Sequence, residues 1–204
     1  MKLTDARYIP HTVAAAFLAA VVIAALAPAE AKLGDTVKLI YLHASITWVA
    51  LAVFAAAALT GIAALLVRSE TLSAWSRASL ATATVYWLGH FVIGLVVMKL
   101  AWGGWFWSEP RVRAGMLILG VAIAATLVAL SVDKSWAAPA LSIGVLIFIY
   151  VLLASVGRVF HPQGAIRSSE SLAIKGAVAA ILFLVGSASL QIARLLRELG
   201  PVKE

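Results

Sequence analysis

The chain of 204 residues contains no cysteine. This absence excludes disulfide bonds, thiol catalysis, iron–sulfur clusters and any metal site that depends on cysteine ligands. Any chemistry must therefore come from histidine, carboxylate, arginine or aromatic side chains.

Charged residues are also scarce, at 12% of the sequence, whereas 63% is hydrophobic and the mean hydropathy is +1.02. Soluble domains carry about 25% charged residues, so this chain cannot cover its surface with polar groups and belongs in a lipid bilayer. The net charge is +7. Because the basic residues are scattered over short loops, they favour membrane lipid headgroups or an anionic ligand over nucleic acid.

Six stretches contain no Asp, Glu, Lys or Arg, and each is close to the ~20 residues that a spanning helix needs. They are residues 9–29, 39–67, 78–98, 114–132, 135–157 and 176–193. They predict an all-α polytopic membrane protein, with six transmembrane helices in a single integral membrane domain, residues 1–204. The first stretch also resembles a secretion signal, but it is long enough to span.

Six spans would place both termini on one side of the membrane, and the loops after the first, third and fifth spans on the other. The positive-inside rule does not decide which side is cytoplasmic, because each side has eight Lys and Arg residues. The loops opposite the termini therefore hold more positive charge than orientation requires, which is compatible with an anionic ligand there.

The loop after the third span contains AWGGWFWSEPR, residues 101–111, which we call the Trp segment. Trp102, Trp105 and Trp107 fall within six residues, and Phe106 stands among them. Indole rings offer flat apolar faces to a planar ligand, but tryptophan is also enriched at membrane interfaces without any ligand.

Two of the four histidines, His43 and His161, fall on the same predicted side as the Trp segment. Histidine nitrogens can take both axial positions of haem iron. Arg111, with Arg113 and Arg158 nearby in the predicted topology, suits the propionate carboxylates. Each histidine alone is equally consistent with an interfacial or loop residue, so the prediction of haem depends on their joint placement.

His90 lies in the middle of the third span. An ionisable residue inside the membrane suggests a function, although a neutral histidine bonded to a backbone carbonyl is equally consistent. A b-type cytochrome would need histidine pairs on facing helices. We expect His43 and His11 to lie at depths different from His90, which disfavours that class.

The Trp segment resembles the tryptophan-rich motif of the CcmC family, haem-handling proteins of cytochrome c assembly, which runs roughly W-G-x-W-W-x-W-D-x-R. Aligned without gaps, Trp102, Gly103, Trp105 and Arg111 match the motif. Elsewhere, Phe106 replaces a Trp, Trp107 falls on a variable position, Ser108 replaces the third Trp, and Glu109 replaces the Asp.

Two further segments are similar to this family. APAEAKLGDTVKLIYLHASITW resembles the approach to its second span, which puts the first axial histidine on His43. SVGRVFHPQG resembles the segment with the second axial histidine and puts it on His161, although Gly157 and Arg158 replace two Trp and Pro162 is inserted.

The resemblance covers nearly the whole chain and implies a haem-binding and haem-delivery scaffold that is not an enzyme. Haem b would be held non-covalently and transiently, with His43 and His161 as axial ligands. The implied cofactor-binding residues are His43, His161, Trp102, Gly103, Trp105, Phe106, Trp107, Glu109 and Arg111.

The resemblance also implies partners and a location. The partners are a membrane-anchored periplasmic haem chaperone and the ATP-binding-cassette transporter subunits of the same assembly system. The location is the inner (cytoplasmic) membrane, with cytoplasmic termini and the Trp segment on the outer face. A haem-attachment synthetase, which uses further histidines within the membrane, stays open because of His90, as does a structural membrane subunit without a ligand.

Overall fold

The computed structural model describes residues 6–30, 33–157 and 169–199. These residues form a short 3-10 helix, Ala6–Tyr8, followed by six α-helices. The helices are α1 (Ile9–Leu26), α2 (Thr36–Val67), α3 (Glu70–Trp102), α4 (Pro110–Ser131), α5 (Ala137–Ser155) and α6 (Leu172–Glu198). Each is long and apolar enough to cross a membrane, so the prediction of an all-α protein with six spans is confirmed over the described residues.

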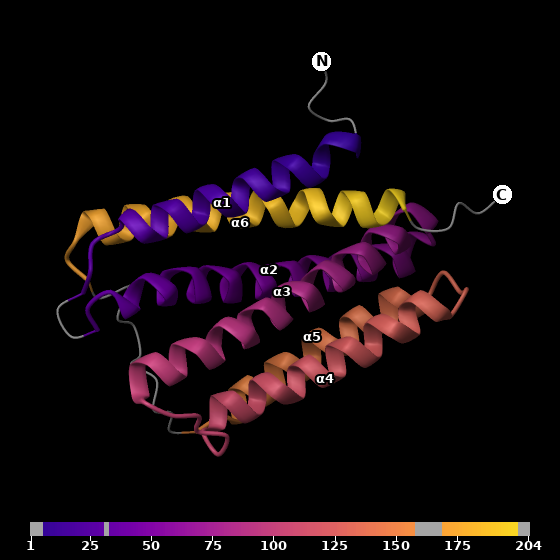
Figure 1. Cartoon of the computed structure of the whole chain (residues 1–204). Helices are drawn as coiled ribbons and strands as arrows, with labels where there is room; N and C mark the ends of the chain where they lie inside the picture. Colours follow the sequence, from indigo (N-terminus) through magenta and orange to yellow (C-terminus); the bar gives the residue numbers. More distant parts are fainter. Residues whose placement is uncertain (1–5, 31–32, 158–168, 200–204) are drawn as a thin grey trace.

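The helices run alternately in opposite directions along one bundle (Figure 1). α1 packs beside α6 on one flank, α4 packs beside α5 on the other, and α2 and α3 lie between them (Figure 1). The α1–α2 and α3–α4 connections lie at one end, together with the end of α5 and the start of α6. The start of α1, the end of α6 and the α2–α3 and α4–α5 turns lie at the other end, as the alternation of spans predicts.

Several helices extend beyond the uncharged stretches that predicted them. α3 begins at Glu70, where the Ser69 side chain accepts a hydrogen bond from the Leu72 backbone N–H at 3.3 Å. α6 continues to Glu198, which Arg194 contacts at 2.8 Å. α3 and α6 thus continue beyond the predicted spans 78–98 and 176–193, because charged residues end the apolar part of a helix without ending its hydrogen bonding.

Small residues bring α2, α3 and α5 into close contact. A Cβ atom on Gly61 would stand 3.0 Å from the Pro139 carbonyl oxygen of α5. The Ser76 hydroxyl of α3 donates to the Ala57 carbonyl at 2.8 Å and lies 3.0 Å from the Ser142 hydroxyl. Close backbone approach with polar cross-links is typical of helix packing in membranes, and here it holds together α2 and α3, the two helices that carry His43 and His90.

Candidate functional site

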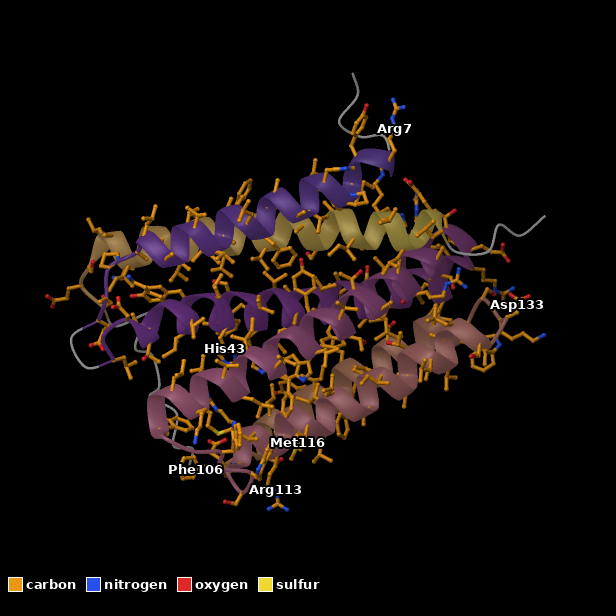
Figure 2. All side chains as sticks on the ribbon, viewed as in Figure 1. Arg7, His43, Phe106, Arg113, Met116 and Asp133 are labelled. Carbon is orange, nitrogen blue, oxygen red and sulfur yellow. The ribbon has the colours of Figure 1, made fainter. Side chains whose placement is uncertain are left out.

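His43 projects from α2 onto α3 in the half of the bundle that also holds Phe106 and Arg113 (Figure 2). Its Nδ1 atom lies 3.1 Å from the backbone carbonyl oxygen of His90. Because a carbonyl can only accept, Nδ1 must donate the proton. In the neutral ring, Nε2 is then the nitrogen with the lone pair.

Gly94 makes room for this arrangement. A Cβ atom at Gly94 would stand 2.9 Å from His43 Cε1 and 3.5 Å from His43 Nδ1. Gly94 is one helical turn after His90, so the missing side chain exposes the α3 backbone where the His43 ring lies.

His90 is held by a second hydrogen bond between the same two helices. Its Nδ1 atom lies 2.6 Å from the Thr47 hydroxyl, and that hydroxyl donates to the His43 carbonyl at 2.6 Å. Since the single hydroxyl proton is used toward the carbonyl, Nδ1 of His90 is the donor to Thr47. Each ring N–H is thus linked to the backbone carbonyl of the other histidine, directly for His43 and through Thr47 for His90.

The two imidazole rings are also stacked. Their centroids lie 4.4 Å apart with an interplanar angle of 24°. Trp87 also lies against His90, with ring centroids 4.6 Å apart and an interplanar angle of 42°, and its indole N–H donates to the Gly115 carbonyl of α4 at 3.0 Å. We call His43, Thr47, Trp87, His90 and Gly94 the His cluster.

The expectation that His43 and His90 lie at different depths was wrong. His43 is about two turns inside α2 and His90 about three turns from the end of α3, yet their rings are in contact. α3 crosses α2 obliquely (Figure 1), so positions at unequal distances from their helix ends come level. His11, by contrast, is exposed in the first turn of α1, at the opposite end of the bundle.

Sequence reasoning missed Thr47, Trp87 and Gly94 as parts of the site. The spacing contained a signal, because Thr47 follows His43 by four residues and Gly94 follows His90 by four. Residues four apart share one face of a helix, but the pairing of the two faces could not be known before α2 and α3 were docked.

The Trp segment forms the tight corner between α3 and α4. Trp102 is the last residue of α3, and Gly103 ends the helix with φ of +76°, a left-handed conformation that glycine adopts readily. Glu109 is fully buried, and its carboxylate accepts a hydrogen bond from the Val112 N–H at 2.8 Å, which caps the start of α4. Glu109 therefore shapes the corner, and Arg111 follows it as an exposed residue in the first turn of α4.

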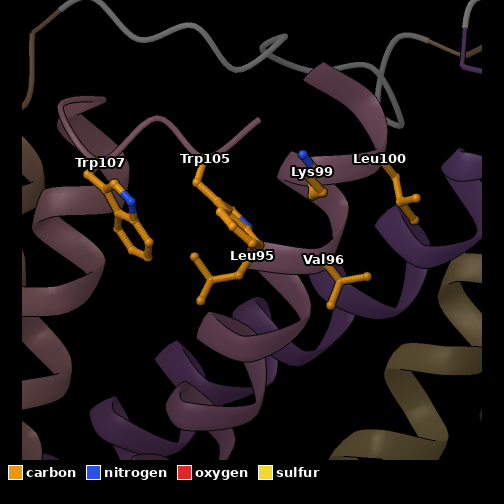
Figure 3. Close-up of a pocket in the computed structure, with 6 residues that line it drawn as sticks. All are labelled: Leu95, Val96, Lys99, Leu100, Trp105 and Trp107. Carbon is orange, nitrogen blue, oxygen red and sulfur yellow. The ribbon is translucent and has the colours of Figure 1, made fainter. Parts of the chain in front are cut away.

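An apolar groove with a volume of about 330 Å³ lies between the Trp segment and α3 (Figure 3). It is lined by Leu95, Val96, Lys99, Leu100, Trp105 and Trp107. Trp105 and Trp107 point side by side toward α3 and remain 56% and 49% exposed. The Lys99 ammonium donates to the Gly103 carbonyl at 3.1 Å and lies 5.4 Å from the centre of the Trp105 ring.

The groove and His43 lie on opposite sides of α3. At about 100° per residue, the four groove residues of α3 centre about half a turn around the helix from Gly94. The structure therefore does not bring Trp105 and Trp107 together with His43. By the same rotation, Met98 and Trp102 lie nearer the His43 side of α3. Phe106 packs with them: its backbone N–H lies 3.3 Å from the Met98 sulfur, and its ring centroid lies 6.1 Å from that of Trp102.

Some predicted site residues lie outside the described residues. They are His161, the second predicted axial ligand, and Arg158. Arg113, like Arg111, is exposed in the first turn of α4 at the Trp-segment end (Figure 2). The prediction that His161 ligates iron stays a prediction.

The His cluster has a restricted coordination chemistry. Two axial ligands of one haem must point their nitrogens at the iron from opposite faces of the ring system, and two face-stacked imidazoles do not. Within the described ranges, no three His, Asp or Glu side chains gather closely enough to hold a metal ion. The orientation of His43 instead suits one axial bond from Nε2, because metal-ligating histidines commonly donate their other ring N–H to a backbone carbonyl.

The described helices define the class of this chain as a multi-pass membrane protein. No family model and no curated protein matches its sequence.

Proposed function

We propose that this chain is a haem-handling membrane protein of cytochrome c biogenesis. It would hold haem b non-covalently for transfer to a membrane-anchored periplasmic haem chaperone, beside the ATP-binding-cassette subunits of the same system. Haem supplies an iron with two axial positions and two propionate carboxylates. The observation that carries the proposal is the 3.1 Å hydrogen bond between His43 Nδ1 and the His90 carbonyl, which directs Nε2 to act as a ligand.

The surroundings of His43 support the same function. His43 is partly exposed and lies in the half of the bundle that holds the Trp segment. Trp102 and Phe106 offer apolar rings on the Met98 side of α3, and aromatic faces suit a planar ligand. A ligand near the end of a bundle can leave it without unfolding the core, as delivery of haem requires.

The positive charge at this end suits the propionates. Arg111 and Arg113 are both exposed in the first turn of α4, and a guanidinium group matches a carboxylate in geometry and charge. Under this proposal the Trp-segment end faces the outer side of the inner membrane. His161 would supply the second axial nitrogen, which rests on the sequence resemblance alone.

A haem-attachment synthetase is the second candidate, and one observation favours it. His90 lies inside α3, stacked on His43 at 4.4 Å, and proteins of that class use histidines within the membrane. An electron-transfer subunit with a His43–His90 axial pair is disfavoured by the stacked geometry described above.

The test is an absorption spectrum of the detergent-purified protein with added haem, oxidised and reduced. The variants are His43→Ala, His161→Ala and His90→Ala, with His11→Ala as the matched control at the opposite end of the bundle. We expect a low-spin bis-histidine spectrum in the wild type and in His11→Ala. His43→Ala and His161→Ala should lose it or convert it to high spin.

Other results would separate the alternatives. Loss of the spectrum in His90→Ala alone would overturn the assignment of His43 and favour a haem ligand deeper in the membrane. Failure of the wild type to bind added haem would reject the proposed function and leave the Trp segment as an interfacial aromatic belt.

A further inference from the structure

The Thr47 hydroxyl contacts a side chain of the neighbouring helix α3, whereas the Thr60 hydroxyl bonds within α2. Thr60, in the same helix, donates to Ala56 and Ala57, carbonyls of its own helix, at 2.7 Å and 3.0 Å. Thr47 makes the equivalent bond to the His43 carbonyl but also meets the His90 ring of α3 at 2.6 Å. Of these two Thr47 contacts, the one with His90 joins α2 to α3.

This link restrains His90 and, through it, His43. With Nδ1 on Thr47, the His90 ring cannot rotate about χ2 without losing that bond, and its face is set against the His43 ring, 4.4 Å away. His43 is then enclosed by the His90 ring and by the α3 backbone at Gly94. In this pose its Nδ1 reaches the His90 carbonyl at 3.1 Å.

We propose that Thr47 and His90 form a positioning pair, which holds the His43 imidazole with its proton on Nδ1 and its lone pair on Nε2. Under the proposed function, neither side chain would bond the haem iron. The biological use of this pair rests on the proposed haem function, but its effect on the His43 tautomer does not.

The pair also tunes the ligand. An N–H group that donates strongly to a carbonyl makes the opposite ring nitrogen a better electron donor. A more basic axial ligand stabilises ferric haem over ferrous haem and lowers the reduction potential. Loss of the restraint should therefore weaken haem binding and raise the potential.

The test compares Thr47→Val with Thr47→Ser and with Thr60→Val. The same methyl-for-hydroxyl change is made at both threonines, and each loses a bond to its own helix, so the difference isolates the contact with His90. The first measurement needs no haem: ¹⁵N chemical shifts of the His43 ring in histidine-labelled protein report which nitrogen carries the proton. We expect protonated Nδ1 in the wild type, Thr47→Ser and Thr60→Val, and a mixture of tautomers in Thr47→Val.

The second measurement is a haem titration with a redox titration of the bound form. Loss of a hydrogen-bonding partner directly behind a metal ligand typically weakens metal affinity about 10–100-fold, and Thr47 acts on His43 one residue further away, through His90. We therefore expect a smaller loss of affinity, below about 10-fold, and a higher reduction potential in Thr47→Val, and wild-type behaviour in Thr60→Val. Identical His43 tautomers in Thr47→Val and Thr60→Val would overturn the proposal.

The two proposals fail separately. If the wild type binds no haem but Thr47→Val still shifts the His43 tautomer, the proposed function is rejected and the positioning pair stands. If Thr47→Val does not fold, His90→Phe breaks the same link from α3, since it keeps an aromatic ring but lacks Nδ1. A wild-type His43 tautomer in His90→Phe would then overturn the positioning pair.

Discussion

Gly94→Ala is the substitution that tests the His cluster most directly. The added Cβ would stand 2.9 Å from His43 Cε1, whereas carbon atoms are most favourable at about 3.5–4.0 Å. The His43 ring must therefore retreat from α3 by roughly 0.6 Å or more to relieve the contact. Its 3.1 Å bond to the His90 carbonyl would then lengthen beyond the useful hydrogen-bond range.

The expected magnitude combines three effects. Overpacking costs about 1–3 kcal/mol, and loss of a hydrogen bond costs about 0.5–1.5 kcal/mol. Replacing a helical glycine by alanine returns roughly 1 kcal/mol. We expect a net loss of about 0.5–3.5 kcal/mol of stability from these terms, together with weaker haem binding because His43 is no longer oriented.

Gly89→Ala is the matched control, because Gly89 lies in the same helix and a Cβ there would meet nothing within 4 Å. Gly89→Ala should gain the same helix propensity as Gly94→Ala, but without a steric contact with His43. Thermal unfolding in detergent and a haem titration, run on both variants, give the comparison. Equal stability and equal haem affinity for the two variants would refute the conclusion that the missing side chain at Gly94 makes room for the His43 ring.

Two further predictions concern the frame of the bundle. Gly61→Ala should be about 1–3 kcal/mol less stable than Gly144→Ala, because its added Cβ would meet the backbone of Pro139 at 3.0 Å. Gly144→Ala has open space around its Cβ and should gain only the helical contribution of roughly 1 kcal/mol. Equal stability of the two variants in the same thermal unfolding assay would contradict the close packing of α2 on α5. Glu109→Ala should lower the stability of the protein by about 1 kcal/mol through loss of the helix cap, and it should speed hydrogen exchange at the start of α4. Ser108→Ala, at an exposed neighbouring position, should do neither. Unchanged exchange in Glu109→Ala would show that the carboxylate does not hold the corner.

Much of the fold followed from local composition. Six uncharged stretches predicted six helices, because a charged side chain is costly, and therefore rare, in the apolar part of a bilayer. The grouping of the α1–α2 and α3–α4 connections at one end followed from the alternation of spans alone. Helix ends were less predictable. The bounds of α3, Glu70 and Trp102, are set by hydrogen bonds at its two caps, and hydropathy contains no information about these bonds.

The site was predictable only in part. The sequence determined that His43 and the Trp segment belong to the same end of the bundle, and it marked both as unusual. It did not determine that His43 reaches His90, because that contact depends on the oblique crossing of α2 and α3 and on the space left by Gly94. Nor did it determine that Trp105 and Trp107 lie across α3 from His43. Composition and spacing describe one helix at a time, and only the packing of α2 on α3 decides which faces meet.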